Sequence, residues 1–194
     1  MAPCCVYGVT CPDNGFITGM RIFIRQVVRM EIDLFYTDGG ASFKDAVARR
    51  LGRTFGLEAR DRGRMRIYEG AWNERRRQYD AYVLLDHLVR CMKSDTAIWL
   101  VDPDIFCENV NFVFGLAMYH IAAVVSVFRL DTPGMVVKET IHEAGHILGL
   151  PHCRNHCVMR FSNSYEDALL KPDIPCMACR RKLDRKIVEP GMRM

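Results

Sequence analysis

The sequence predicts an α/β fold in which helices pack on a β-sheet. Segments with the strand pattern and segments with the helix pattern alternate through the first two thirds of the chain, as is typical of such folds. The chain has 194 residues, 49% of them hydrophobic, which is enough to bury a core without disulfide bonds. Its longest apolar run, residues 116–128, is shorter than the roughly 20 residues that a transmembrane helix needs.

The expected strands are short and rich in β-branched and aromatic residues. Residues 21–36 form one long or two short strands, and residues 64–68 form another after the charged turn at 60–63. Three apolar segments complete the set, and the last of them is continuously apolar and therefore expected inside the sheet: 97–101, 112–117 and 121–130.

Two helices are expected from the spacing of apolar residues in the first half of the chain. The first covers residues 42–55, with Ser42 and Asp45 as a capping box and Gly56 as its end. The second covers residues 78–92 and places Tyr82 on its apolar face.

A third expected helix, residues 136–150, follows a turn at 132–134 and is stopped by Pro151. Beyond it the regular patterning fades, although about 40 residues remain. A structureless tail of that length is unusual in a compact domain, so another interaction is expected to order it.

The third helix contains the sequence His-Glu-Ala-Gly-His-Ile-Leu-Gly-Leu-Pro-His, from His142 to His152. Helix positions i and i+4 lie about 40° apart around the axis and about 6 Å apart along it, so His142 and His146 project toward one ion. Gly149 can adopt a positive φ that turns the chain and brings His152 to the same place. Three imidazoles with an open fourth position are typical of catalytic zinc.

Glu143 follows the first histidine, rotated by about 100° around the helix, where it can touch a metal-bound water without binding the metal. The metal would lower the pKa of that water toward about 7 and polarise a carbonyl, and Glu143 would act as general base. The alternative is a histidine pair that binds no metal, on a surface or in a core. It does not account for five motif positions that match in one segment.

Four cysteines follow the histidines: Cys153, Cys157, Cys176 and Cys179. Their C-x3-C and C-x2-C spacings fit chelation of a structural zinc ion by four thiolates. Such a site would order the patternless tail, and its loss would disorder the floor of the adjoining histidine site. The alternative is that the cysteines are reduced and bind no metal. His156 could replace one thiolate, but the favoured interpretation is a solvated or hydrogen-bonded loop histidine.

The cysteine total is nine, so complete internal disulfide pairing is impossible. The first residues lack a secretory signal, so the expected compartment is the reducing cytoplasm, where paired cysteines bind metal more often than they form disulfides.

Cys4, Cys5 and Cys11 have no fourth ligand nearby and receive no role. The net charge of +4 is modest, and the basic segments 60–66 and 180–186 are predicted to be solvated surfaces.

The combined pattern, HEAGHILGLPHCRNHCVMRFSNS followed by CMAC, resembles the archaemetzincin family of zinc metallopeptidases in the metzincin clan. The match is specific over residues 139–183 and looser through 111–115 and 125–130. The resemblance implies that Met159 lies beneath the catalytic metal. The clan's common tyrosine two residues later is replaced by Phe161, so a tyrosine ligand is not expected.

The resemblance also implies details of the fold. It implies a zincin-like α/β domain with a twisted mixed sheet, an active-site helix and an irregular, zinc-stabilised C-terminal segment. An edge strand at 112–117 would pair antiparallel with an extended peptide. The residues of that strand expected to bind substrate are Phe112, Val113, Phe114 and Gly115.

The expected domain organisation is simple. Residues 1–19 are an N-terminal extension, and residues 20–194 form a single metzincin-like catalytic domain. Within it, residues 20–149 supply the sheet and the helices, and residues 150–194 are held by the structural zinc.

The sequence therefore predicts a zinc metallopeptidase that hydrolyses peptide bonds and binds two zinc ions, one catalytic and one structural. A peptide or protein substrate is the only expected partner of a monomer that binds neither membrane nor nucleic acid. One alternative is a catalytically silent, zinc-stabilised binding protein on a peptidase fold, which Glu143 disfavours because binding alone needs no base beside the ion. Another is hydrolysis of a small amide.

Overall fold

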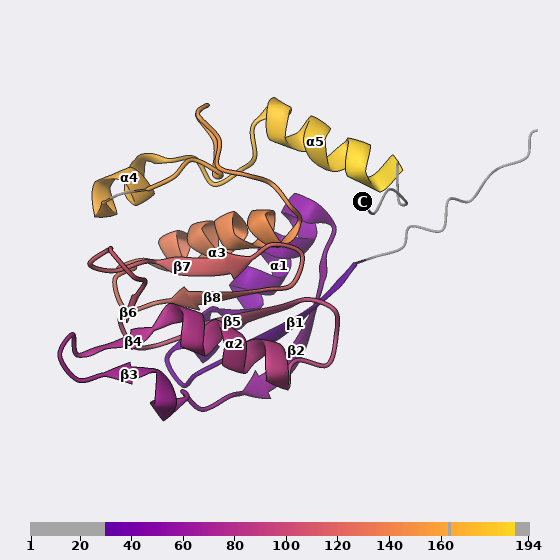
Figure 1. Cartoon of the computed structure of the whole chain (residues 1–194). Helices are drawn as coiled ribbons and strands as arrows, with labels where there is room; N and C mark the ends of the chain where they lie inside the picture. The colour runs from indigo at the N-terminus through magenta and orange to yellow at the C-terminus, as the bar shows by residue number, and fades with distance from the viewer. Residues whose placement is uncertain (1–29, 163, 189–194) are drawn as a thin grey trace, which may run out of the picture.

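The computed structural model describes residues 30–162 and 164–188. Its centre is a five-stranded mixed sheet with strand order β2-β1-β5-β8-β7, in which β7 is antiparallel to β8 and the other pairs are parallel (Figure 1). The prediction of an α/β fold with a mixed sheet is confirmed. The strands of this sheet are β1 Glu31–Tyr36, β2 Glu58–Arg64, β5 Ala97–Val101, β7 Gly115–Met118 and β8 Ala122–Ser126.

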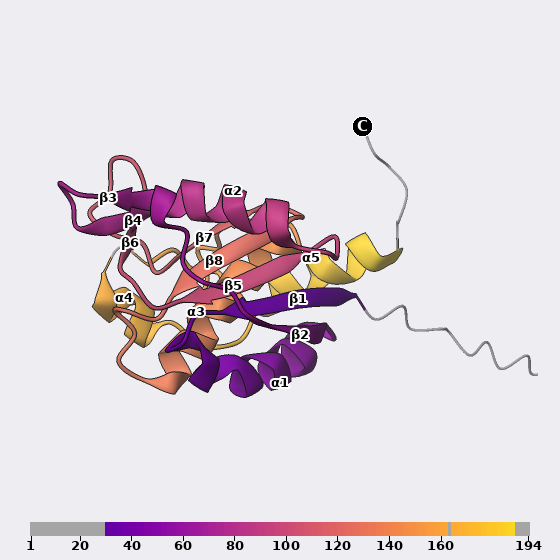
Figure 2. The same cartoon turned by 90° about the horizontal axis from the view of Figure 1, so that it is seen from below.

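Helices cover both faces of this sheet. Figure 2 shows α2 (Ala81–Cys91) on one face and α1 (Lys44–Phe55) with α3 (Pro133–Ile147) on the other. Figure 1 shows α4 (Tyr165–Leu170) and α5 (Met177–Val188) beyond α3, on the side away from the sheet. The remaining elements are the 3-10 helices η1 Gly40–Phe43 and η2 Glu69–Ala71 and a small three-stranded sheet of β3 Trp72–Asn73, β4 Gln78–Asp80 and β6 Ile105–Phe106.

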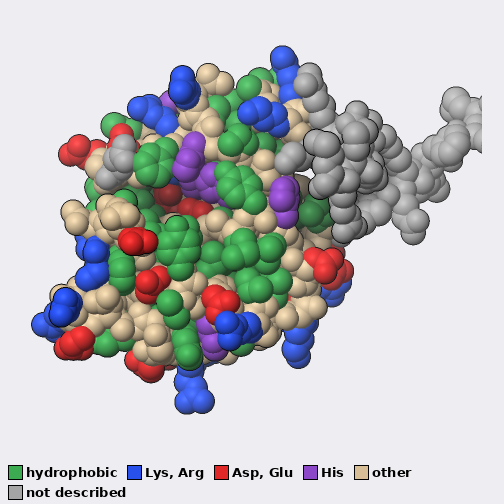
Figure 3. All heavy atoms as spheres, in the orientation of Figure 1, with side chains coloured by type: hydrophobic (Ala, Val, Ile, Leu, Met, Phe, Trp, Pro, Cys, Tyr) green, Lys and Arg blue, Asp and Glu red, His purple; other side chains and the backbone are tan. Residues whose placement is uncertain are grey.

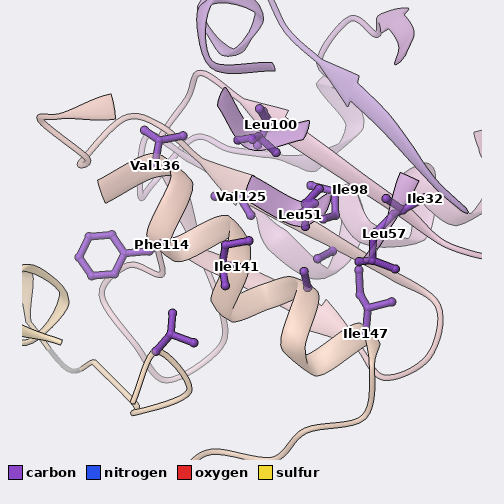
Figure 4. Packing of buried hydrophobic residues seen from close by; sticks show 14 of the residues in the cluster. Ile32, Leu51, Leu57, Ile98, Leu100, Phe114, Val125, Val136, Ile141 and Ile147 are labelled. Carbon is purple, nitrogen blue, oxygen red and sulfur yellow. The ribbon is translucent and has the colours of Figure 1, made fainter. Parts of the chain in front are cut away.

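The core holds α3 firmly against the sheet. Alternate residues of a strand point to opposite faces, so Ile98 of β5 packs toward α1 and α3 while Trp99 packs toward α2. On the α3 side, Ile141 and Ile147 interlock with strand residues such as Val125 (Figure 4). These side chains are almost fully buried, and each large one contributes about 1.5–3 kcal/mol of apolar transfer free energy. Helix α3 therefore offers a rigid base for side chains on its other face.

Several predicted elements are present, some of them with the predicted boundaries. Strand β5 begins and ends as predicted, and Gly56, with φ of 72°, ends α1 as predicted. The predicted capping box is wrong, because the Ser42 hydroxyl donates to the Gly39 carbonyl oxygen (2.8 Å) and η1 precedes the helix. Strand β8 lies inside the sheet, as its continuous apolar sequence predicted.

The predicted strand at 64–68 is wrong, because the strand is the charged segment β2 itself. This strand lies at the sheet edge and pairs parallel with β1. Its arginines therefore do not need to be buried, and each pairs with an acidic side chain: Arg60 with Glu31, Arg62 with Asp33 and Arg64 with Asp38. The apolar alternation that marks a strand is absent where ion pairs replace packing.

The helix predictions need two corrections. Helix α2 begins at Ala81, because the Asp80 carboxylate caps it by accepting from the backbone N–H of Tyr82 (2.8 Å), and the Tyr82 side chain is exposed. Helix α3 begins at Pro133, because the Thr132 hydroxyl caps it. The turn predicted at 132–134 is instead the start of the helix, where proline is well tolerated.

Two further corrections concern the end of the sequence and the edge strand. The segment after Pro151, predicted to be irregular, contains α4 and α5. The edge strand β7 begins at Gly115, and Val113 before it forms an antiparallel bridge with Ile105.

Residues 1–29, with Cys4, Cys5 and Cys11, lie outside the described residues. In the described part of the chain no helix has the length and apolar character needed to cross a membrane.

Candidate metal centre

The three motif histidines converge at the end of α3. His142 and His146 lie one turn apart on the helix, and Gly149, with φ of 80°, turns the chain after it. The Leu150 N–H then donates to the Gly145 carbonyl oxygen (2.8 Å), which closes the turn. As a result the His152 ring lies 4.7 Å from the His146 ring, and all three histidines offer ligand nitrogens within 4.8 Å of one another.

Backbone carbonyls fix the orientation of two of these rings. Nδ1 of His142 lies 2.7 Å from the Val158 carbonyl oxygen, and Nδ1 of His146 lies 2.8 Å from that of Leu150. Because a carbonyl oxygen only accepts, each ring donates through Nδ1 and leaves Nε2 without a proton. The two Nε2 atoms lie 3.1 Å apart, and two unprotonated nitrogens at that separation fit a shared cation. The residues present therefore fit a metal ion such as zinc.

Burial keeps the imidazoles in the form that binds metal. It lowers the pKa of His142 well below its ordinary value and lowers that of His146 to about 4. Burial also lowers the pKa of His152, which is nearer the surface, and the Lys171 ammonium adds to the effect. Neutral imidazole is the ligand form, so the site is ready for a cation at neutral pH.

The histidines and Glu143 line one cavity of about 530 Å³, between α3, β7 and the chain after His152. Figure 3 shows histidine and acidic side chains at a hollow bordered by hydrophobic ones. A side chain at Gly115 would not fit, since its Cβ would lie 2.7 Å from Cγ of Glu143. This cavity is lined by all four residues that were predicted to bind substrate: Phe112, Val113, Phe114 and Gly115.

Glu143 is a buried carboxylic acid with a perturbed pKa. Burial raises its pKa to about 8, the Glu139 carboxylate adds to the rise, and the Lys171 ammonium opposes it. A carboxyl group whose pKa lies near neutrality exchanges a proton readily under working conditions, which general acid and base chemistry requires.

Met159 forms the floor beneath the motif. Its side chain is fully buried, and a Cβ at Gly145 would overlap its sulfur. The Met159 carbonyl oxygen accepts from the Cys153 N–H (2.8 Å). Gly145 therefore leaves the space that Met159 occupies, and the segment after His152 lies closely against α3.

The four cysteines form a second cluster next to the first. The Cys153 and Cys176 sulfurs are 3.8 Å apart, and those of Cys157 and Cys179 are 3.7 Å apart. Four sulfurs about 2.3 Å from a central zinc would be about 3.8 Å from one another, so this spacing fits a tetrahedral ion. His156 is not a member of either cluster found among the described residues.

Hydrogen bonds favour a thiolate at one position of this cluster. Burial raises the pKa of Cys176, but donation from the Cys179 N–H and the Asn155 amide outweighs it and lowers that pKa to about 6. Burial raises the pKa of Cys157. The protein groups alone therefore stabilise one thiolate, and a bound cation is needed for all four.

The cavity contains residues that the sequence did not single out. Glu139 and Lys171 form an ion pair (2.9 Å) that is almost fully buried and lines the cavity. The Tyr119 ring, also not singled out, lies against His146, whereas the ring of Phe161, which stands where the clan has a tyrosine, lies against His152. Glu139 precedes His142 by three residues on one helical face, so a helical wheel could have found it. Lys171 lies where no periodic pattern signals a role.

The edge strand of the mixed sheet lies beside a helix that carries two histidines and a glutamate, and a third histidine follows after a turn. This arrangement defines the class of zinc metallopeptidases. The model of peptidase family M54 matches residues 62–185, more than half of the chain. The chain belongs to this family, and it is a zinc metallopeptidase of the archaemetzincin type, as the sequence motifs predicted.

Curated relatives and solved structures agree with this assignment. The chain is 45% identical to the archaemetzincin of Nanoarchaeum equitans over 113 residues (58% of this chain and 66% of the relative). It is 44% identical to that of Archaeoglobus fulgidus over 119 residues (58% and 72%). The crystal structure of the A. fulgidus protein with malonate matches with a TM-score of 0.72 at 35% identity, over 79% of this chain and 99% of that one. The Methanopyrus kandleri archaemetzincin matches with a TM-score of 0.75 at 32% identity (86% and 99%).

Proposed function

We propose that this chain hydrolyses peptide bonds at the histidine site, with His142, His146 and His152 as zinc ligands and Glu143 as general base. The observation that carries the proposal is the pair of unprotonated Nε2 atoms 3.1 Å apart, beside a buried glutamate in the same cavity. Zinc bound there supplies a Lewis acid that polarises the scissile carbonyl and lowers the pKa of water.

Glu143 performs the proton transfers. Its carboxylate takes a proton from the attacking water and then gives it to the amine that leaves. Its burial and its raised pKa support both steps, because the group holds a proton between them at little cost. The absence of a side chain at Gly115 leaves the space that the Glu143 carboxyl group occupies between β7 and α3.

The substrate binds as an additional strand beside β7. This strand is the edge of the five-stranded sheet, and its free side faces the cavity. β7 runs in the same direction as α3, since Gly115 lies at Glu143 and the His120 N–H, after the end of the strand, donates to the Ile147 carbonyl oxygen (3.1 Å). A peptide paired antiparallel with β7 therefore runs opposite to α3.

The four cysteines bind a structural zinc ion that holds the chain after His152 in place. This role is supported by the sulfur separations and by the Val158 N–H, which donates to the Ile174 carbonyl oxygen (3.0 Å) across the cluster. Met159 and Gly149 shape the histidine site from below and behind. Residues 20–194 act as one catalytic domain in this proposal, and residues 1–19 are an extension of it.

The test combines zinc analysis with digestion of a peptide library by the full chain and by Glu143→Gln. We expect two zinc ions in both proteins and loss of cleavage in the variant only. The matched control is Glu166→Gln, an exposed glutamate of α4, which should cleave like the wild type. Two zinc ions without cleavage of any peptide would instead favour a silent binding protein. Cleavage of small amides alone would favour an amidase.

A further inference from the structure

We propose that the ion pair of Glu139 and Lys171 forms a subsite for a carboxamide side chain, glutamine or asparagine, on the residue that follows the cleaved bond. This inference rests on the proposed peptidase function and names the side chain that the cavity selects. Neither residue belongs to the zinc ligands or to the proton-transfer group.

The subsite lies one helical turn from the reacting centre. Glu139 is three residues before His142 and four before Glu143, so it lies about 60° and 40° from them around α3 and about 4.5–6 Å along the axis. All three line the same cavity. Because a bound peptide runs opposite to α3, the residue after the cleaved bond lies toward the N-terminal half of the helix, at Glu139.

The pair offers hydrogen bonds that the described residues leave unused. Glu139 Oε2 accepts from Lys171 Nζ (2.9 Å), while Oε1 is buried and has no partner in the described part of the chain. The hydroxyl of Ser162, which lines the same cavity, is also buried without a partner there. An unsatisfied buried acceptor is unfavourable, so a donor on the substrate gains by reaching it.

Charge decides which donor fits best. The pair is neutral as it stands, with side chains 3% and 1% exposed, so a lysine or glutamate side chain would add a third buried charge without a partner. The neighbouring Lys138 does not line the cavity, and its ammonium donates to the carbonyl oxygens of Leu169 (2.8 Å) and Lys171 (3.0 Å), so it is not placed to pair with a substrate carboxylate.

A carboxamide fits without adding charge. Its N–H₂ donates to Glu139 Oε1, and its oxygen accepts from Lys171 or Ser162. An apolar side chain of the same length, such as methionine, leaves these groups unpaired. Sites built on buried polar groups discriminate strongly against such analogues.

The test uses peptides that differ only in the residue after the cleaved bond, which is glutamine, methionine, lysine or glutamate. With the zinc-loaded full chain, we expect kcat/KM for glutamine to exceed that for each of the others by about 10- to 100-fold. The double variant Glu139→Met/Lys171→Met removes both charges together, so no buried ion is left alone, and it should prefer the methionine peptide. A surface control, Glu166→Gln/Lys182→Met, should keep the glutamine preference.

A binding measurement makes the result independent of turnover. Hydroxamic acids with a propionamide or a matching alkyl side chain are titrated calorimetrically into the zinc-loaded wild type and the double variant. The wild type should bind the carboxamide compound more tightly by about 10-fold or more, and the double variant should reverse the order. Equal binding, or an order unchanged in the double variant, overturns the subsite. Failure to cleave any peptide while the hydroxamates keep this order overturns the peptidase proposal alone.

Discussion

The two candidate metal sites are adjacent in sequence, yet they are built in different ways. The histidine site lies on α3, which is packed into the core, and carbonyl oxygens orient two of its rings. The cysteine site joins the chain after His152 to the start of α5, and few backbone hydrogen bonds cross it. We infer that the fold organises the first site, whereas zinc at the second site would organise the chain around it. Loss of metal should therefore lower mainly activity at the histidine site, and should lower stability at the cysteine site.

The largest expected effect is that of Cys157→Ser. Structural zinc sites contribute directly to folding free energy, so we expect this variant to lose at least about 4 kcal/mol of stability, or roughly 10 °C in Tm. The variant should keep one zinc ion, at the histidine site. It should lose peptidase activity, because the cysteine site no longer holds the segment that carries Met159. Thermal unfolding, limited proteolysis and zinc analysis measure these effects.

The control for that variant is Cys91→Ser. Cys91 is an exposed free cysteine outside both clusters, so its replacement should change neither zinc content nor Tm. A Cys157→Ser protein that keeps its wild-type Tm would show that the cysteine site does not organise the C-terminal segment.

His146→Ala should separate activity from folding. The helix that carries His146 is held by the core, so Tm should fall by only a few degrees. Loss of the Lewis acid should lower kcat/KM by at least about 1,000-fold, equivalent to about 4 kcal/mol. A large drop in Tm with loss of α3 protection in hydrogen exchange would contradict a preorganised histidine site.

Two glycines test how tightly the floor of the histidine site is packed. Gly145→Ala introduces a Cβ that overlaps the Met159 sulfur, and we expect a loss of about 2–3 kcal/mol, measured by urea unfolding. Gly52→Ala is the matched control in α1, where the nearest atom to the new Cβ is 3.5 Å away. It should stabilise the protein by about 0.5–1 kcal/mol, because alanine is the better helix former.

The smallest effect concerns acid stability of the sheet, away from both metals. Burial raises the pKa of Asp33, but hydrogen bonds from Ser94, Arg62 and the Lys93 N–H outweigh it and hold the pKa below the ordinary value. A lowered folded-state pKa stabilises the protein above about pH 4 and stops doing so as the pH falls through the folded value. Asp33→Asn should therefore cost about 1–2 kcal/mol at pH 7 and progressively less as the pH falls below about 4.

Urea unfolding of both proteins at each pH measures this difference. Because both proteins are expected to lose bound zinc on acidification, the difference between them, and not the absolute stability, reports Asp33. A difference that does not change with pH would show that the charge of Asp33 is not what stabilises the sheet.

The strength of sequence prediction varied with the local signal. β5 was predictable because all five of its residues are apolar, and α1 was predictable because of its periodic apolar positions and Gly56. β2 was not, because an edge strand whose arginines form ion pairs has no apolar alternation. α5 was not predicted because its basic sequence has little apolar periodicity.

For the metal sites, the spacing of ligands along the chain carried most of the information. Histidines at i and i+4 share a helical face whatever surrounds them, and paired cysteines at short spacing chelate one ion. The sequence alone therefore determined the class of enzyme and the candidate ligands. Only the tertiary structure decided that Glu139 meets Lys171, 32 residues away, in the cavity beside Glu143. Such contacts depend on how segments pack across the fold, and no local pattern encodes that.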